Sequence, residues 1–471
     1  MEMLLLLTTI FAAAAAVAAS SSDDPSITDF PALVTWFRSH GGFIDDRITM
    51  GWETMKPSSH IGTTAAASTP NNNNEINHRI RGMLATERIE PETVLIHIPK
   101  YLMLSEAPSS SNDHKCALIQ TVIDELTLGK ESKWHMYFKF DGTNSDNEPS
   151  ASSSNDGPTR VPTQWVREGQ PGSRAIHELQ GLPPFGKTHT HVDWYSQACN
   201  DSNELTQTQL QALMMFITRA ADRGMVPMYD LMNHHNGLIN TRLTVDEDGG
   251  LSVIATTAIQ PNEPIYNTYA RGGMQSTVDI FNTYGFVEDY PQLWRWSDDT
   301  IQELDEDDPN HAFQRYVNPI DNTVGVDVNG RGFEPNSSFY EILVVSPTLG
   351  ALHPTKALVQ VLGEGQRTLH EWEEEITNHH ATLRLSYVNT IHDSAEYILD
   401  KLPTTIEEDE REILPNEKRL YEKVKKKGRV DQMKADTIQA IEYRLAFKKA
   451  LKLAVDIAER EKGFYEDTEE L

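Results

Sequence analysis

Apolar residues recur at helical spacing early in the chain and again near its middle. Residues 30–37 (FPALVTWF) place their apolar side chains on one face of a helix. A second run starts behind Thr206 and Thr208, whose hydroxyls can cap a helix, and it delivers Arg219 to the next loop. The apolar positions of this second run are Leu210, Leu213, Met214 and Ile217. Both segments are predicted to be amphipathic helices.

Between these helices, short apolar runs bounded by turn residues predict strands. Residues 94–98 (VLIHI) are stopped by Pro99, and a proline-containing turn separates them from residues 84–85. Residues 241–245 and 251–254 flank a glycine-bearing turn, which predicts a hairpin. Strands and helices do not alternate regularly. This excludes a doubly wound parallel sheet and favours the α+β class.

Beyond about residue 340 the pattern becomes helical and charged. Residues 404–409 (TTIEED) begin with hydroxyls and continue with acids, which is typical of a helix N-terminus. A helical apolar stripe follows at Ile438, Ile441, Leu445, Leu451, Val455 and Ala458. An all-helical C-terminal domain is therefore predicted over residues 340–465.

Three segments are predicted to lie outside the folded core. Residues 63–74 and 142–158 are low in complexity, so we expect an exposed insertion and a disordered loop. Residues 1–19 are apolar and end in small residues, which predicts a signal peptide or targeting segment. They lack Lys and Arg, so a short membrane anchor is the alternative. We expect the secretory pathway or an organelle reached through it, with glycan acceptors at Asn200 and Asn336.

Length and composition limit the number of domains and the kinds of partner that the chain could have. The chain has 471 residues, more than one hydrophobic core usually organises, so two domains are expected. Its formal net charge of −29 argues against nucleic acid and favours a basic or neutral protein substrate. Only Cys116 and Cys199 are present, which excludes a Cys-rich zinc module and leaves one disulfide open. The string His189, His191 and Asp193 lacks a second ligand cluster, so no metal site is predicted. After the leader, no stretch is long and apolar enough for a membrane span.

Three motifs follow one another in the middle of the chain. They are residues 226–234 (VPMYDLMNH), 263–269 (EPIYNTY) and 279–286 (DIFNTYGF), and residues 81–86 (RGMLAT) precede them. Each is weak alone, because asparagine is common in turns and aromatic residues are common in cores. Their order and spacing make the combination specific. It resembles the SET-domain protein methyltransferases, in the branch of the Rubisco large-subunit methyltransferase and the actin-histidine methyltransferase.

The resemblance implies an architecture. A SET fold of short strands would have its N-terminal part in residues 28–106 and its C-terminal part, with the cofactor site, in residues 221–290. A helical segment would be inserted at 107–220. Residues 340–465 would correspond to the helical substrate-binding domain of the same branch.

By the same resemblance, the cofactor is S-adenosylmethionine. Arg81, Gly82 and Met83 would form the loop at its methionine end, where glycine lets the backbone approach closely. Asn233 and His234 would hold the cofactor through the side-chain amide and the backbone. The other positions that the resemblance assigns are Arg219 at the amino-acid end, Tyr284 and Phe286 at the cofactor, with Phe286 facing the adenine, and Tyr229 and Tyr266 at the substrate.

Tyr269 matches the catalytic tyrosine of the family, whose hydroxyl orients the acceptor amine. The pKa of lysine, ~10.4, lies about three units above pH 7, so deprotonation of the amine at pH 7 costs roughly 4–5 kcal/mol. Desolvation disfavours the charged amine and can lower its pKa part of the way. Histidine, with a pKa of ~6.5, needs a much smaller change in pKa. A monomeric protein-lysine methyltransferase is the prediction, and a protein-histidine methyltransferase is the alternative.

Departures from the family pattern motivate a third hypothesis, a degenerate SET module that binds protein without catalysis. Ala270 follows Tyr269 where glycine is usual, about three extra residues fall within 271–275, Thr277 replaces a frequent asparagine, and Ile80 replaces a first glycine. Ala221 and Tyr229 stand where the histidine-specific enzyme has asparagine and tryptophan.

Overall fold

The computed structural model describes the chain in segments. These are residues 29–54, 79–105, 112–140, 161–165, 173–182, 190–200, 205–221, 224–269, 275–288, 292–297, 339–344, 389, 392–393, 395–425 and 431–469. The predicted leader at 1–19, the low-complexity stretch at 63–74 and the predicted loop at 142–158 lie outside these residues. Within the described segments, every helix is too short or too polar to cross a membrane.

The chain folds as two compact units, each assembled from separate stretches of sequence. The first unit comprises Met1–Ser154, Leu205–His234 and Leu238–Asn267, and the second comprises Asn155–Glu204, His235–Gly237 and Thr268–Leu471. The segment predicted as an insertion, residues 107–220, is therefore divided between the two units.

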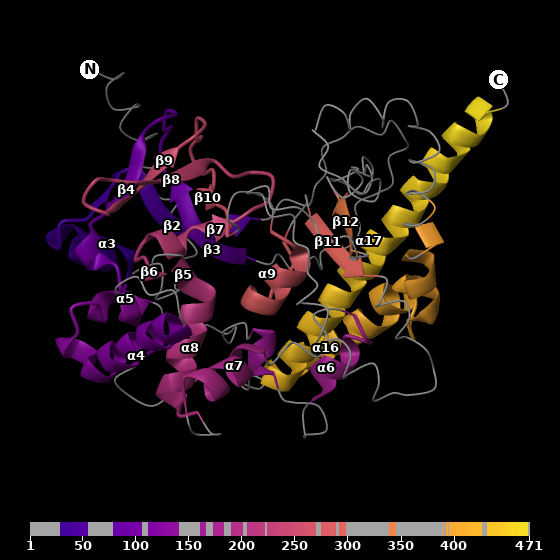
Figure 1. The fold of residues 1–471 in the computed structure, drawn as a ribbon, viewed down its shortest axis with the longest axis horizontal. Coiled ribbons are helices and arrows are strands. Elements are labelled where there is room, and N and C mark those ends of the chain that lie inside the picture. Colours follow the sequence, from indigo (N-terminus) through magenta and orange to yellow (C-terminus); the bar gives the residue numbers. More distant parts are fainter. Residues whose placement is uncertain are drawn as a thin grey trace, which may run out of the picture. The chain divides into compact units, whose positions relative to one another are not determined.

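A four-stranded antiparallel sheet is the largest sheet among the described residues of the first unit. Its strands, in spatial order, are β1 (Phe43–Ile44), β4 (Val94–Ile98), β9 (Leu251–Ala255) and β8 (Thr241–Val245). Figure 1 labels β4, β9 and β8. Strands β8 and β9 confirm the predicted hairpin, with Thr241 paired to Ala255 and Val245 to Leu251. Alternate residues of β9 are buried, and Val253 is fully enclosed. Strand β9 thus directs one face into the core.

Shorter strand pairs in the same unit carry most of the predicted cofactor residues. They are β2 (Ile48–Thr54) with β3 (Arg79–Ala85), β7 (Asn233–His234) with β10 (Tyr266–Asn267), and β5 (Ala220–Ala221) with β6 (Gly224–Met225). Strands β2 and β3 are antiparallel, and β7 and β10 are parallel. A bridge between Leu84 and Pro264 joins β3 to the segment that leads into β10. These pairings bring β2, β3, β7 and β10 next to one another.

The helices of the first unit include both amphipathic segments predicted from the sequence. The described helical elements are α3 (Phe30–Ser39), α4 (Asn112–Leu128), α5 (His135–Phe140) and α8 (Gln207–Arg219), with shorter turns η1 (Lys100–Leu102), η2 (Gly129–Glu131) and η4 (Tyr229–Leu231). Thr206 caps helix α8, because its hydroxyl accepts a hydrogen bond from the Gln209 N–H at 3.2 Å. Leu213 is fully buried on its inner face, and Arg219 is its last residue. The capped helix at this position is confirmed.

The second unit is mainly helical among its described residues. Its elements are η3 (Pro162–Gln164), α6 (Arg174–Glu178), α7 (Thr190–Ala198), α9 (Thr277–Tyr284), β11 (Gln292–Ser297), β12 (Phe339–Val344), α15 (Ile406–Glu408), the π-helical η5 (Asp409–Ile413), α16 (Leu414–Lys425) and α17 (Gln432–Glu469). Thr405 caps α15, since its hydroxyl accepts from the Glu408 N–H at 3.1 Å. This confirms the helix start predicted at residues 404–409.

The core of the second unit packs on α17, the long yellow helix of Figure 1. Phe281 of α9 stacks on Tyr443 at a centroid distance of 3.9 Å. Trp294 of β11 stacks on Phe447 at 4.7 Å. The predicted apolar stripe of α17 is buried except for half-buried Ile438. The stacked aromatic residues also belong to this core, and the stripe predicted from the sequence did not include them.

The pairing of β11 with β12 was not predicted. The helical domain was expected from about residue 340, but residues 339–344 (FYEILV) form a strand whose Ile342 lies opposite Trp294. Aromatic and aliphatic residues of this kind fit a pleated, partly buried surface. The partner strand is more than forty positions away in the sequence, so no short turn marked the pair.

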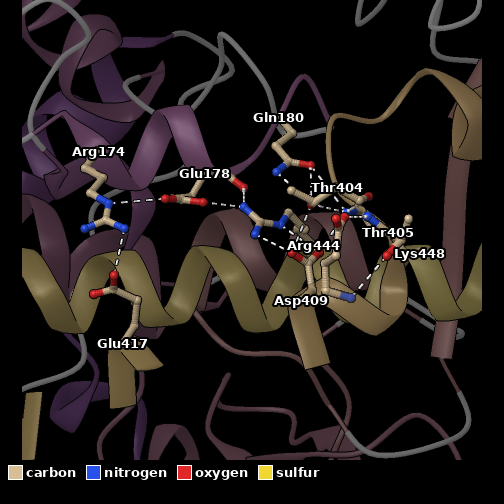
Figure 2. A network of polar contacts seen from close by, with 10 residues as sticks. Arg174, Glu178, Gln180, Thr404, Thr405, Asp409, Glu417, Arg444 and Lys448 are labelled. Carbon is tan, nitrogen blue, oxygen red and sulfur yellow. Dashed lines mark hydrogen bonds and ion pairs between the residues drawn. The ribbon is translucent and has the colours of Figure 1, made fainter. Parts of the chain in front are cut away.

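A buried ionic network joins α6, η5 and α17 within the second unit (Figure 2). The Arg444 guanidinium donates to both carboxylate oxygens of Asp409, at 2.9 and 2.5 Å, and to Glu178 Oε2 at 2.5 Å. The Lys448 ammonium donates to Asp409 Oδ2 at 2.7 Å and to the Thr404 hydroxyl at 2.7 Å. Burial alone would raise the pKa of Asp409, but the hydrogen bonds from Arg444 and Lys448 hold it below its ordinary value of 3.8. The Asp409 carboxylate is thus ionised although it has no exposed surface, and both of its oxygens accept hydrogen bonds.

Candidate functional site

The predicted glycine loop and the predicted asparagine meet in the first unit. The Asn233 side-chain amide donates to the Arg81 carbonyl at 2.9 Å. It also donates to Glu53 Oε1 at 2.7 Å. The Arg81 carbonyl belongs to β3, Asn233 begins β7, and Glu53 lies on β2. Residues from three strands therefore converge on one amide group.

Gly82 is required by this close approach. A Cβ atom added to it would lie 2.2 Å from Glu53 Oε1 and 2.5 Å from Asn233 Nδ2, far inside van der Waals contact. Only a residue without a side chain leaves these two groups their positions. The flanking residues differ in environment: the Arg81 guanidinium lies 4.9 Å from the centre of the Phe140 ring, whereas Met83 is fully buried.

The backbone around Tyr266 is fixed by buried polar groups. The Asn240 amide donates to the Pro264 carbonyl at 2.8 Å, and Asn240 Oδ1 accepts from the Tyr266 N–H at 2.9 Å. The Thr241 hydroxyl donates to the Tyr266 carbonyl at 2.7 Å. The Tyr266 hydroxyl donates to Glu53 Oε2 at 3.1 Å. Tyr266, predicted to contact substrate, thus shares a carboxylate with Asn233.

Arg219 and the Pro-x-x-Asp element form a second cluster in the first unit. Arg219 Nη1 lies 3.5 Å from Asp230 Oδ2 and donates to the Asp230 carbonyl at 3.4 Å. The Tyr137 hydroxyl also donates to Asp230 Oδ2. Tyr229 begins the short turn η4 immediately after Met228, whose φ is +73°, a region that few residues other than glycine adopt. The turn leads into Asn233 and buried His234.

Three predicted aromatic residues gather in the second unit. The Tyr269 and Tyr284 ring centres are 4.4 Å apart, and those of Tyr284 and Phe286 are 6.3 Å apart. Tyr284 ends helix α9, and Gly285 follows it with φ +78°, which closes the helix and turns the chain toward Phe286. The motif of tyrosine, glycine and phenylalanine is thus a helix C-cap that places the Tyr284 ring between those of Tyr269 and Phe286 in a chain of ring contacts.

A buried polar cluster lies beside this motif in the second unit. The Glu288 carboxylate accepts from the Thr277 hydroxyl at 2.6 Å and from the Asn236 amide at 3.1 Å. Asn236 also bonds both backbone groups of Gln275, at 3.0 and 2.8 Å. Thr277, which replaces an asparagine of the family pattern, therefore keeps a polar role. Burial lowers the pKa of the neighbouring His235, and its Nδ1 accepts from the Gly237 N–H at 3.0 Å, as the neutral ring requires.

The structure distributes the predicted site residues between the two units. The first unit contains Arg81, Gly82, Met83, Arg219, Tyr229, Asn233, His234 and Tyr266, and the second contains Tyr269, Tyr284 and Phe286. Ala270 lies outside the described residues. Among those described, no group of three or more His, Cys, Asp or Glu could hold a metal ion. Glu53, Asn240 and Glu288 were not predicted, because they act through contacts with distant segments.

The comparisons with known proteins bear on this arrangement. The family model of the SET domain matches residues 80–270. The match spans the glycine loop, the Asn233-His234 pair and Tyr269. Residues 80–270 therefore form a SET domain, and the α+β fold class with a helical C-terminal region is confirmed.

Solved structures extend the comparison. The structure of "Rubisco LSMT bound to AdoMet" is 18% identical, with 94% of this chain and 93% of that chain covered, at a TM-score of 0.48. The "SET domain of LSMT bound to Lysine and AdoHcy" is 16% identical, with coverage of 95% and 92% and a TM-score of 0.44. A comparison with curated proteins found no matching sequence.

Proposed function

We propose that this chain is an S-adenosylmethionine-dependent protein methyltransferase and that its acceptor is lysine. The observation that carries the proposal is the cradle at Gly82, where Asn233 and the Arg81 carbonyl are held within hydrogen-bond distance inside a SET domain. A glycine whose replacement would displace the Glu53 carboxylate or the Asn233 amide, next to that amide and the Arg81 carbonyl, fits the polar methionine end of the cofactor.

The cofactor would supply an electrophilic methyl group on a sulfonium. The backbone at Arg81 and Gly82 and the Asn233 amide would hold it, and the Tyr269 hydroxyl would orient the acceptor nitrogen. The nitrogen attacks with a neutral lone pair, so lysine must first lose a proton. At pH 7 that loss costs roughly 4–5 kcal/mol, and removal of the bound amine from water would lower this cost by disfavouring the charged form. The negative charge of the whole chain attracts a lysine-rich substrate.

Incubation of the purified chain with S-adenosylmethionine and fractionated protein tests the proposal. Mass spectrometry of the products should localise the added methyl groups to lysine side chains. The value of kcat/KM should rise with pH toward the pKa of ~10.4 of the free lysine, whereas a histidine acceptor would give a plateau above ~6.5. Methylation found on histidine alone would overturn the lysine assignment. Folded protein that shows no heat of binding with S-adenosylmethionine would instead support a degenerate, protein-binding module.

We further propose that the chain enters the secretory pathway or an organelle reached through it. Cys116 and Cys199 are both disulfide-bonded, and such bonds persist in oxidising compartments. The apolar leader supplies the means of entry. N-terminal sequencing of the protein from its native cells should find a start near residue 20, and alkylation without a reductant should label neither cysteine. A retained Met1 together with two labelled thiols would contradict this proposal.

A further inference from the structure

Strand β8 lies at one end of the four-stranded sheet, among the strands that the structure describes. Its residues Leu243 and Val245 pair with Val253 and Leu251 of β9, and directly paired residues lie on the same face of a sheet. Val253 and Leu251 are buried, whereas Leu243 and Val245 are 39% and 47% exposed. The buried apolar face of the sheet therefore continues onto β8, where it is open to solvent.

The backbone of β8 also has hydrogen-bonding groups that point away from β9. The Asp246 N–H donates to the Gly250 carbonyl at 3.0 Å across the hairpin. Successive residue pairs of an antiparallel ladder alternate between hydrogen-bonded and non-hydrogen-bonded positions. The N–H and C=O groups of residues 243 and 245 therefore point to the outer edge. An extended segment could bond to these groups and continue the sheet.

This edge has few of the features that usually prevent strand pairing. Proline, lysine and bulges commonly block exposed edges. The five residues of β8 (TRLTV) include neither proline nor lysine, and their pairing with β9 has no register shift. The one charged side chain, Arg242, donates to the Glu92 carboxylate. Leu243 and Val245 are thus the apolar side chains that an added strand would cover.

The charge at the end of β8 indicates the chemistry of the partner. Residues 246–248 (DED) form the tip of the hairpin, and all three are exposed. His97 Nδ1 lies 3.9 Å from the Asp246 carboxylate, and a Cβ atom added to Gly249 would meet Lys100 Cδ at 3.2 Å. Even if both of these side chains were charged, three carboxylates would leave the tip negative. A segment with lysine or arginine complements this charge, whereas a second copy of the chain, with a net charge of −29, is disfavoured.

We propose that β8 is a docking edge for an extended, basic segment of a partner protein, which adds to this sheet as a further strand. Apolar side chains at every second position of the segment would cover Leu243 and Val245. Its lysine or arginine side chains would lie near residues 246–248. The proposal does not depend on the reaction that the chain catalyses, although the lysine-rich substrate proposed above has the required charge.

Fluorescence anisotropy with a labelled peptide of alternating valine and lysine tests the proposal on the full chain. The wild type should bind this peptide. A peptide of alternating valine and glutamate should bind at least about 10-fold more weakly, because the hairpin tip repels it. The valine–lysine peptide methylated on every backbone nitrogen keeps its charge but loses its N–H donors, and it should also bind at least about 10-fold more weakly.

Two variants separate the apolar and the ionic parts of the surface. Val245→Ser should bind the valine–lysine peptide about 3- to 10-fold more weakly than the wild type, because less apolar surface is covered. Glu247→Gln should weaken binding about 2- to 5-fold at low salt, and the difference should shrink as salt is added. The matched control is Val94→Ser, since Val94 is 39% exposed but lies on β4, an inner strand of the same sheet. Its affinity should equal that of the wild type.

Several results would overturn the proposal. They are a wild type that does not bind the valine–lysine peptide, equal affinity for the valine–glutamate peptide, and equal affinity for the N-methylated peptide, which would mean attraction by charge alone. Equal losses in Val245→Ser and Val94→Ser would reject the edge as the binding site, and if Val245→Ser does not fold, the three peptides on the wild type decide. Wild-type dimers in sedimentation that dissociate in Val245→Ser would assign the edge to a second copy instead. None of these results bears on the proposed function, which methyl transfer tests.

Discussion

Replacement of Tyr269 by phenylalanine is expected to lower the rate of methyl transfer by about 10²- to 10³-fold while cofactor affinity stays unchanged. The change removes the hydroxyl proposed to orient the acceptor nitrogen. It keeps the ring, whose centre lies 4.4 Å from that of Tyr284, so the local packing is preserved. Single-turnover rates with an unmodified peptide that contains the methylation site found by mass spectrometry measure the first effect. Calorimetry with S-adenosylmethionine measures the second.

The matched control is Tyr101→Phe, which removes the same atom from an exposed side chain of the first unit. The Tyr101 hydroxyl donates to the His40 carbonyl at 2.8 Å and belongs to none of the clusters of predicted site residues. Its turnover should match that of the wild type. Wild-type turnover in Tyr269→Phe would remove this tyrosine from the catalytic role.

The second large effect is expected on stability. Asp409→Asn should lower the free energy of unfolding by about 3–5 kcal/mol, because it leaves the buried charges of Arg444 and Lys448 without their shared carboxylate. Urea unfolding of the full chain, followed by the fluorescence of its tryptophans, measures the change. The exposed pair of Glu410 and Lys449 provides the control: Glu410→Gln should cost less than about 1 kcal/mol.

The stability contributed by Asp409 also depends on pH. Its folded pKa lies below the ordinary value of 3.8, so the unfolded chain takes up the proton first as the pH falls. The contribution is fully present above that ordinary value and is lost as the pH falls through the folded pKa. The difference in stability between wild type and Asp409→Asn should therefore shrink below about pH 3.8. A difference that stays constant down to pH 2 would show that the carboxylate charge contributes little.

Features encoded by neighbouring residues could be predicted from the sequence. The hairpin of β8 and β9 follows from two short strand segments that flank a glycine-bearing turn. The start of α8 follows from the hydroxyls of Thr206 and Thr208, which precede an apolar pattern at helical spacing. The ordered motifs likewise indicated a SET domain, since residue order survives even where Thr277 and Ile80 depart from the family pattern.

What escaped prediction depends on residues that are far apart in the chain. Glu53 is one acid in a strand of otherwise unremarkable sequence, and its importance arises only when Gly82 and Asn233 lie beside it. Glu288 acquires donors from Asn236 and Thr277 in the same way. The ladder of β11 and β12 joins strands with no common turn. The hydrophobic period shows which face of a helix or strand is buried, but it does not identify the residues that pack against that face.

The path of the chain constrains how the protein can be divided. The segment 235–237 belongs to the second unit although both of its flanking segments belong to the first. No contiguous fragment therefore contains one unit without pieces of the other. A fragment that contains the whole first unit, residues 1–267, also carries α6 and α7 of the second, and exchange of either unit with a relative by a single crossover would divide the other one.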